Sequence, residues 1–124
     1  AKNNLQNNII LLGQIDNIYP LFKNSKGFIL SSLWEDPGFV LVEAGICRTP
    51  VLSSDAWPGP IEIINNEING IIFRNNDEVN FIQKFNYFKS KEIQKKLKLN
   101  NLKNCRRFTL FSHYKYLNEI LIKN

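Results

Sequence analysis

Short apolar runs alternate with amphipathic stretches along the first two thirds of this 124-residue chain. Four of the runs have the length of buried strands, and they lie at Ile9–Leu12, Gly27–Ser31, Pro50–Ser53 and Gly70–Phe73. Between them, helical spacing is found near Ile18–Phe22, from Phe39 to about Cys47, and at Ile61–Ile64. Strands that alternate with helices in this rhythm predict βαβ units and a parallel sheet. The absence of polar alternation within the runs indicates a sheet covered on both faces.

The last third of the chain, from Asp77 onward, has the spacing of helices only. One predicted helix carries Phe81, Phe85 and Phe88 on one face, and the final helix repeats apolar residues every three or four positions. We therefore expect one domain over residues 1–124, with an α/β core at 8–76 and C-terminal helices at 77–124. The expected fold is a partial Rossmann-like parallel sheet of about four strands flanked by helices.

The formal net charge is +5 and the pI is about 9.3, and the basic residues crowd into the last third. A charge run of this kind is usually a solvated helix face, and the alternative is attraction to an anionic membrane or substrate. Nucleic acid is not an expected partner, because the aromatic residues follow core spacing. No apolar run reaches the roughly 20 residues that span a bilayer, and Ala1–Asn4 lack the order of a signal peptide. We expect a cytoplasmic protein that can contact the inner face of the membrane peripherally.

The cysteines and the histidine do not form a metal pattern. Cys47 and Cys105 are far apart and have no His or Cys neighbour, so we expect two free, buried thiols. His113 lies alone on an aromatic-rich stretch, where a structural role is the more common one. We predict no metal site and no cofactor.

The loop after the second apolar run contains the candidate chemistry. Glu35 and Glu43 flank a Pro-Gly pair at a predicted strand-to-helix turn. Gly38 has no Cβ, so a ligand can approach its backbone. The next three amides, on Phe39, Val40 and Leu41, are expected to be unpaired donors that can hold a diphosphate. The carboxylates can accept hydrogen bonds from sugar hydroxyls, although spacing alone is equally compatible with a dipole-stabilising Glu43 and a solvated Glu35.

The ten residues Glu35–Ala44 resemble the E-x7-E motif of the retaining glycosyltransferases of the GT-B fold, glycosyltransferase family 4. The surrounding order of features is also similar to that family, over roughly Asn8 to Asp77. Downstream of the motif the chain has a Gly-x-x-x-x-Pro-Val segment, a Gly-Pro-x-Glu-Ile loop and an Asn-Gly-Ile-Ile turn, at Gly45–Val51, Gly59–Ile63 and Asn69–Ile72.

The resemblance implies a role for each matching position. Glu43 would hold the ribose hydroxyls, and Glu35 would contact the transferred sugar together with Gly38 and Phe39. The amides of Gly38, Phe39 and Val40 would serve the diphosphate. The base would lie near a loop of three residues, Gly13, Gln14 and Ile15.

The activity implied by the resemblance is transfer of a hexose-type sugar from a nucleotide-diphosphate sugar, with retention of anomeric configuration. The acceptor would be a glycan or a lipid-linked glycan, as in polysaccharide biosynthesis. We favour uridine diphosphate over guanosine diphosphate as the nucleotide. No essential metal is implied, because helix ends and basic side chains offset phosphate charge in this fold.

The chain also departs from the family pattern. Family members have an acceptor-binding domain upstream and an earlier βαβ segment with a basic residue pair, and Lys2 does not lie in such a turn. These cations stabilise the leaving nucleotide, so we predict no complete catalytic set and an inactive fragment. The alternative function is a non-enzymatic α/β module that docks a membrane or a protein partner through its basic C-terminal helices.

Overall fold

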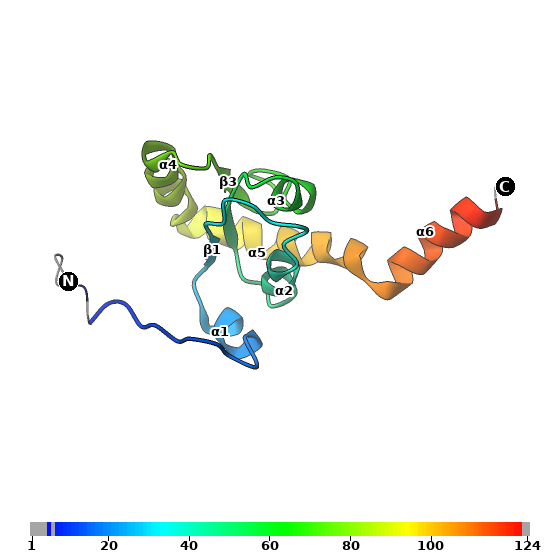
Figure 1. Ribbon diagram of the computed structural model, residues 1–124, viewed down its shortest axis with the longest axis horizontal. Coiled ribbons are helices and arrows are strands. Elements are labelled where there is room, and N and C mark those ends of the chain that lie inside the picture. The colour runs from blue at the N-terminus through cyan, green and yellow to red at the C-terminus, as the bar shows by residue number, and fades with distance from the viewer. Residues whose placement is uncertain (1–4, 6, 123–124) are drawn as a thin grey trace.

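The computed structural model describes Leu5 and residues 7–122, and the centre of this part is a three-stranded parallel sheet (Figure 1). Its strands lie in the order β1 (Phe28–Leu30), β2 (Val51–Ser54), β3 (Ile71–Phe73). The helices before β3 are α1 (Tyr19–Asn24), α2 (Val40–Ile46) and α3 (Gly59–Ile63). Those after it are α4 (Glu78–Phe88), α5 (Lys91–Cys105), the 3₁₀ helix η1 (Arg106–Phe108) and α6 (Leu110–Ile122). The predicted α/β fold, a parallel sheet flanked by helices, is confirmed.

The middle strand, β2, is buried on both faces of the sheet. All four residues of β2 are buried, and the side chains of successive residues point to opposite faces of the sheet. Val51 belongs to an apolar cluster with residues of α2 and α3, whereas Leu52 belongs to a second cluster with residues of β3, α4 and α5. Both faces of the sheet are therefore covered at its central strand, as the absence of polar alternation predicted, whereas Ile29 of the edge strand β1 is 40% exposed.

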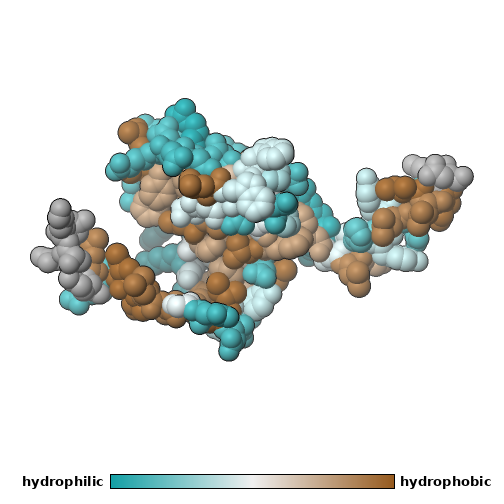
Figure 2. Space-filling view, in the orientation of Figure 1, coloured by the Kyte–Doolittle hydropathy of each residue, from teal (hydrophilic) through white to brown (hydrophobic). Residues whose placement is uncertain are grey.

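The predicted strand at Ile9–Leu12 is wrong. These four residues are irregular and exposed, and Leu11 has 93% of its surface accessible. The blue N-terminal segment in Figure 1 runs away from the sheet, and it forms a brown, apolar surface in Figure 2. A strand forms only where its backbone groups pair with a neighbouring strand, and this segment does not reach the edge strand β1. The four residues at the start of the chain, Lys2 among them, lie outside the described residues.

The helices predicted from Asp77 onward are confirmed, and side-chain caps define where the first two begin. The Asp77 carboxylate accepts a hydrogen bond from the Asn80 amide at 2.8 Å, and the Ser90 hydroxyl accepts one from the Ile93 amide at 3.3 Å. Both are typical N-caps that satisfy free donors in the first helical turn. Helices α4 and α5 pack on the sheet, and their residues Phe88 and Leu97 belong to the core.

Helix α6 differs from the other long helices because it does not pack on the sheet. None of its described residues is buried, and Figure 1 shows it projecting from the end of α5. Its apolar residues include Leu110, Phe111 and Leu121, all exposed. Their helical spacing predicted the helix, but not the absence of a covering surface. Among the described residues, no helix has both the length and the apolar character needed to cross a lipid bilayer.

The two cysteines are free, and they occupy different environments. Cys105 is buried, and its thiol donates a hydrogen bond to the Val42 carbonyl oxygen at 3.4 Å. Burial raises the pKa of the Cys105 thiol to about 11 from an ordinary value of 9.0. Cys47 is partly exposed, which differs from the expectation that both thiols are buried.

We predict that iodoacetamide at pH 8 alkylates Cys47 in the folded protein and leaves Cys105 intact, because the thiolate is the reactive form. The raised pKa also makes folding sensitive to alkali. Below about pH 9 both states keep the Cys105 proton, whereas between pH 9 and pH 11 the unfolded chain releases it first, so stability falls. Peptide mass spectrometry and urea unfolding at stepped pH measure these effects. Equal alkylation of the two cysteines in folded protein would contradict the prediction.

Candidate functional site

The loop that follows β1 holds Glu35 in a defined position. The Ser32 hydroxyl donates a hydrogen bond to Glu35 Oε1 at 2.6 Å. Ser32 is itself fixed, because its carbonyl oxygen accepts a hydrogen bond from the Ser54 hydroxyl at 2.6 Å. Glu35 is only partly exposed, so it is a positioned carboxylate and not the freely solvated loop residue that spacing alone allowed.

Gly38 forms the turn between this loop and α2. Its φ angle is +78°, a left-handed conformation that residues with a Cβ rarely adopt. A Cβ added there would lie 3.7 Å from Glu35 Oε2, so the glycine and the carboxylate are direct neighbours. Gly38 is buried, whereas the next residue, Phe39, is 59% exposed. The turn is therefore packed on its inner side and open on its outer side.

Three consecutive main-chain amides of this turn are free within the described residues. The N–H groups of Gly38, Phe39 and Val40 donate no hydrogen bond to any of them. The fourth amide differs from the expectation, because Leu41 donates to the Gly38 carbonyl oxygen at 3.0 Å. An early i→i−3 bond of this kind satisfies one donor of the first turn and leaves the preceding ones for another acceptor.

Glu43 lies in the first turn of α2, and seven residues separate it from Glu35. It is partly exposed, and its side chain has no hydrogen bond or ion pair with another described residue. Its amide donates to the Phe39 carbonyl oxygen at 3.0 Å, which ties the start of the helix to the turn. The two glutamates therefore flank the free amides along the chain, one held by Ser32 and one available.

The loops after β2 and β3 meet the first loop at the same edge of the sheet. The Gly59 amide donates to the Glu35 carbonyl oxygen at 3.0 Å, and the Asn75 side-chain amide donates to the Leu33 carbonyl oxygen at 3.2 Å. Asn75 also donates its main-chain amide to the Asp55 carboxylate at 2.7 Å. The carboxyl ends of three parallel strands thus form one connected rim, where ligands bind in folds of this class.

Several side chains at this rim were not predicted from the sequence as parts of the site. Ser54 and Asn75 bind the first loop from positions 22 and 42 residues away from their partners. The short polar residues that end each strand are the signal that could have identified them. Two tryptophans, Trp34 and Trp57, are 66% and 70% exposed on these loops, so most of each side chain is open to solvent.

The structure does not bring the predicted base-proximal loop to this rim. Gly13, Gln14 and Ile15 lie on the exposed N-terminal segment, and no described atom lies within 4 Å of the position of a Gly13 Cβ. Their contact with a base remains a prediction. His113 is exposed on α6, and among the described residues no three His, Cys, Asp or Glu side chains are grouped closely enough to hold a metal.

A parallel α/β sheet with a glycine turn and two acidic side chains at its carboxyl edge is typical of a Rossmann-like ligand-binding domain. Residues 1–107 match the family described as glycosyl transferases group 1. The chain belongs to the group 1 family of glycosyl transferases.

Relatives and solved structures agree with this membership. An uncharacterised glycosyltransferase of Methanocaldococcus jannaschii, MJ1059, is 44% identical over 68 residues, which are 55% of this chain and 17% of that protein. A glycosyltransferase from Rickettsia africae has a TM-score of 0.80 at 25% identity, covering 94% of this chain and 32% of that one. Anabaena Alr3699/HepE, solved with UDP and glucose, has a TM-score of 0.82 at 22% identity, covering 97% and 33%. The likeness to the Anabaena structure shows the fold alone. This chain spans about a third of each of the two solved structures and a smaller part of the archaeal relative.

Proposed function

We propose that this chain is the donor-binding portion of a retaining transferase of the glycosyltransferase family 4 type. It would take a hexose-type sugar from a nucleotide-diphosphate sugar for transfer to a glycan or lipid-linked acceptor, as part of polysaccharide biosynthesis in the cytoplasm. Family membership favours this reading over the non-enzymatic docking module.

The observation that carries the proposal is the set of three free amides at Gly38, Phe39 and Val40, with a carboxylate before and after them. A diphosphate accepts hydrogen bonds from such donors and is attracted by the partial positive charge they carry. Carboxylates beside a diphosphate are unfavourable unless they bind neutral donors. Sugar and ribose hydroxyls are donors of that kind, and they lie on either side of the diphosphate in a nucleotide sugar.

The proposed roles follow from these positions. Glu43, without an internal partner, binds the ribose hydroxyls, and Glu35, oriented by Ser32, contacts the transferred sugar beside Gly38 and Phe39. Uridine diphosphate is the favoured nucleotide, and the presence of UDP with glucose in the Anabaena structure supports that choice. No metal is required, because main-chain donors offset phosphate charge.

Catalysis needs more than these groups. A leaving nucleotide is stabilised by cations that contact its phosphates. Arg74 follows β3 at the same edge of the sheet, but its guanidinium pairs with the Asp77 carboxylate at 2.8 Å. We therefore propose that the residues described here bind the donor and that transfer requires basic groups outside them.

Titration of the ¹⁵N-labelled 124-residue chain with UDP tests the proposal. We expect millimolar UDP to shift the amide resonances of Gly38, Phe39 and Val40 first, and GDP to act more weakly. Uridine alone is the control, since it lacks the diphosphate and should leave these three amides nearly unchanged. Shifts elsewhere with none at this turn would show that the donor site lies in another place.

A further inference from the structure

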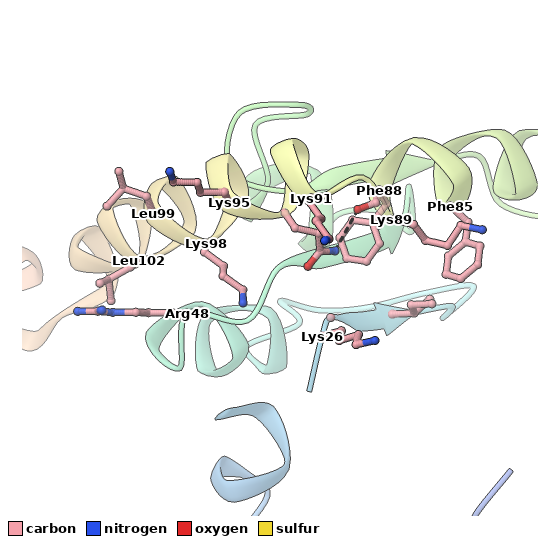
Figure 3. Close-up of a pocket in the computed structure, with 13 residues that line it drawn as sticks. Lys26, Arg48, Phe85, Phe88, Lys89, Lys91, Lys95, Lys98, Leu99 and Leu102 are labelled. Atoms are coloured by element: carbon pink, nitrogen blue, oxygen red, sulfur yellow. Dashed lines mark hydrogen bonds between the residues drawn. The ribbon is translucent and has the colours of Figure 1, made fainter. Parts of the chain in front are cut away.

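A second concave surface lies at the opposite edge of the sheet. It has a volume of about 1000 Å³, and we call it the basic groove. Lys26 and Gly27 precede β1 and Arg48 follows α2, so this end of the groove lies where the strands begin. Figure 3 shows the end of α4 and the side of α5 on the other side of the groove. None of the motif residues lines it, and it is therefore separate from the donor site.

The groove concentrates positive charge without compensation. Six of its lining residues are cations and none is an Asp or Glu; the cations are Lys26, Arg48, Lys89, Lys91, Lys95 and Lys98. The ion pairs found among the described residues, Arg74–Asp77 and Lys84–Glu67, involve none of them. Like charges gathered on a concave surface focus a positive potential that favours an anionic ligand.

The same groove is also apolar. Its walls include Phe85 and Leu102, which are partly exposed, and Ile29 and Leu99, which are 40% and 57% exposed. Lys89 lies over the Phe85 ring at 5.0 Å, so its charge borders apolar surface directly. Inorganic phosphate would use only the charges of the groove, because it would leave the apolar walls exposed to water. A nucleic acid would need free ring faces for stacking, whereas the Phe88 ring is buried and the Phe85 ring stacks on Phe81 and lies under Lys89.

We propose that the basic groove docks the protein on a bilayer by binding an anionic phospholipid. Lysine ammonium groups bind the headgroup while their methylene stems and the apolar walls contact the first part of an acyl chain. This inference is independent of the donor site. It adds to the proposed function a way of keeping the protein at a membrane, where lipid-linked acceptors are found.

Vesicle flotation with the 124-residue chain tests the groove. We expect binding to vesicles of phosphatidylcholine with about 30% phosphatidylglycerol, weaker binding in high salt, and little to phosphatidylcholine alone. The variant Lys95→Glu/Lys98→Glu should lower the partition coefficient by at least about 25-fold, since each of the two basic residues near an anionic surface contributes roughly fivefold. The matched control is Lys103→Glu/Lys115→Glu, which changes two exposed lysines outside the groove by the same charge.

A second pair of variants separates the groove from the exposed helix α6. Leu99→Asn removes an apolar wall of the groove, and Leu121→Asn removes an apolar residue of α6 with 71% exposure. We expect only the first to weaken vesicle binding. Because all six substituted positions are exposed, circular dichroism should report folded protein, and the UDP-induced shifts at Gly38 should persist in every variant.

Three outcomes would overturn the proposal. Equal loss in the groove and control variants would mean that general charge, and not the groove, attracts the vesicles. Loss caused by Leu121→Asn alone would assign the contact to α6. A dimer in sedimentation that Leu99→Asn dissociates would make the groove an interface between two copies. A negative UDP titration would remove the donor site and leave the vesicle result unaffected.

Discussion

Replacing Gly59 with alanine is expected to displace the Glu35 loop and to lower the affinity for UDP by up to about 100-fold. Gly59 is the first residue of α3, and it packs against the main chain of the motif loop. A Cβ at this position would lie 2.6 Å from the Pro37 carbonyl carbon and 2.8 Å from the Glu35 carbonyl oxygen. Main-chain atoms cannot rotate away as a side chain can, so the loop itself has to move.

The same substitution should reduce the free energy of unfolding by roughly 1–3 kcal/mol, which is the usual cost of overpacking. Isothermal titration with UDP and urea unfolding measure the two effects. Gly27→Ala is a matched control, because its Cβ would lie 2.7 Å from a ring atom of Phe88, on the far side of the sheet from the donor site. We expect it to lose stability and to keep UDP affinity. If both variants lost affinity in proportion to stability, Gly59 would have no specific role in the loop.

The sheet could be predicted because its central strand is buried on both faces and its neighbours are largely apolar. Short apolar runs at Phe28–Leu30, Val51–Leu52 and Ile71–Phe73 carry that information locally, and the caps at Asp77 and Ser90 mark the helices. The run at Ile9–Leu12 has the same composition and forms no strand. An apolar run indicates that burying its side chains is favourable, but whether a neighbouring strand is present to pair with it depends on the whole fold.

The position of the glycine turn could be predicted for a similar reason. A strand, a polar loop with Gly38, and a helix follow one another within 20 residues, which places the glycine turn at the carboxyl edge of the sheet. How the loop is held could not be predicted. Its anchors, Ser54, Gly59 and Asn75, come from other loops, and their hydrogen bonds depend on how three connections meet in space.

The basic C-terminal third shows the limit of compositional reasoning. Its lysines fit the solvated helix face that charge runs usually form, and most of them are exposed on α5. The structure adds that Lys91, Lys95 and Lys98 share one side of that helix with Leu99 and face a concave surface. Net charge alone cannot distinguish lysines that are spread over a helix face from lysines that are gathered around a groove.

The Glu43→Gln substitution discriminates most directly between a ribose-binding carboxylate and a glutamate that only stabilises the start of α2. If Glu43 accepts hydrogen bonds from ribose hydroxyls, neutralising it should weaken UDP binding by about 10- to 100-fold, since hydrogen bonds to charged groups contribute roughly 1.5–3 kcal/mol. If it makes no such contact, its removal takes a negative charge away from the neighbourhood of the diphosphate. Binding would then become tighter.

The two interpretations of Glu43 therefore predict changes of opposite sign. Glu92→Gln is the matched control, because Glu92 also lies in the first turn of a helix, α5, and is exposed. Repeating the titration with 2′-deoxyuridine diphosphate completes the comparison. Removing the 2′ hydroxyl from the ligand should weaken binding to the wild-type chain and have a smaller effect on Glu43→Gln, because the variant has already lost most of that hydrogen bond. Independent, additive losses would show that the carboxylate and the hydroxyl do not contact each other.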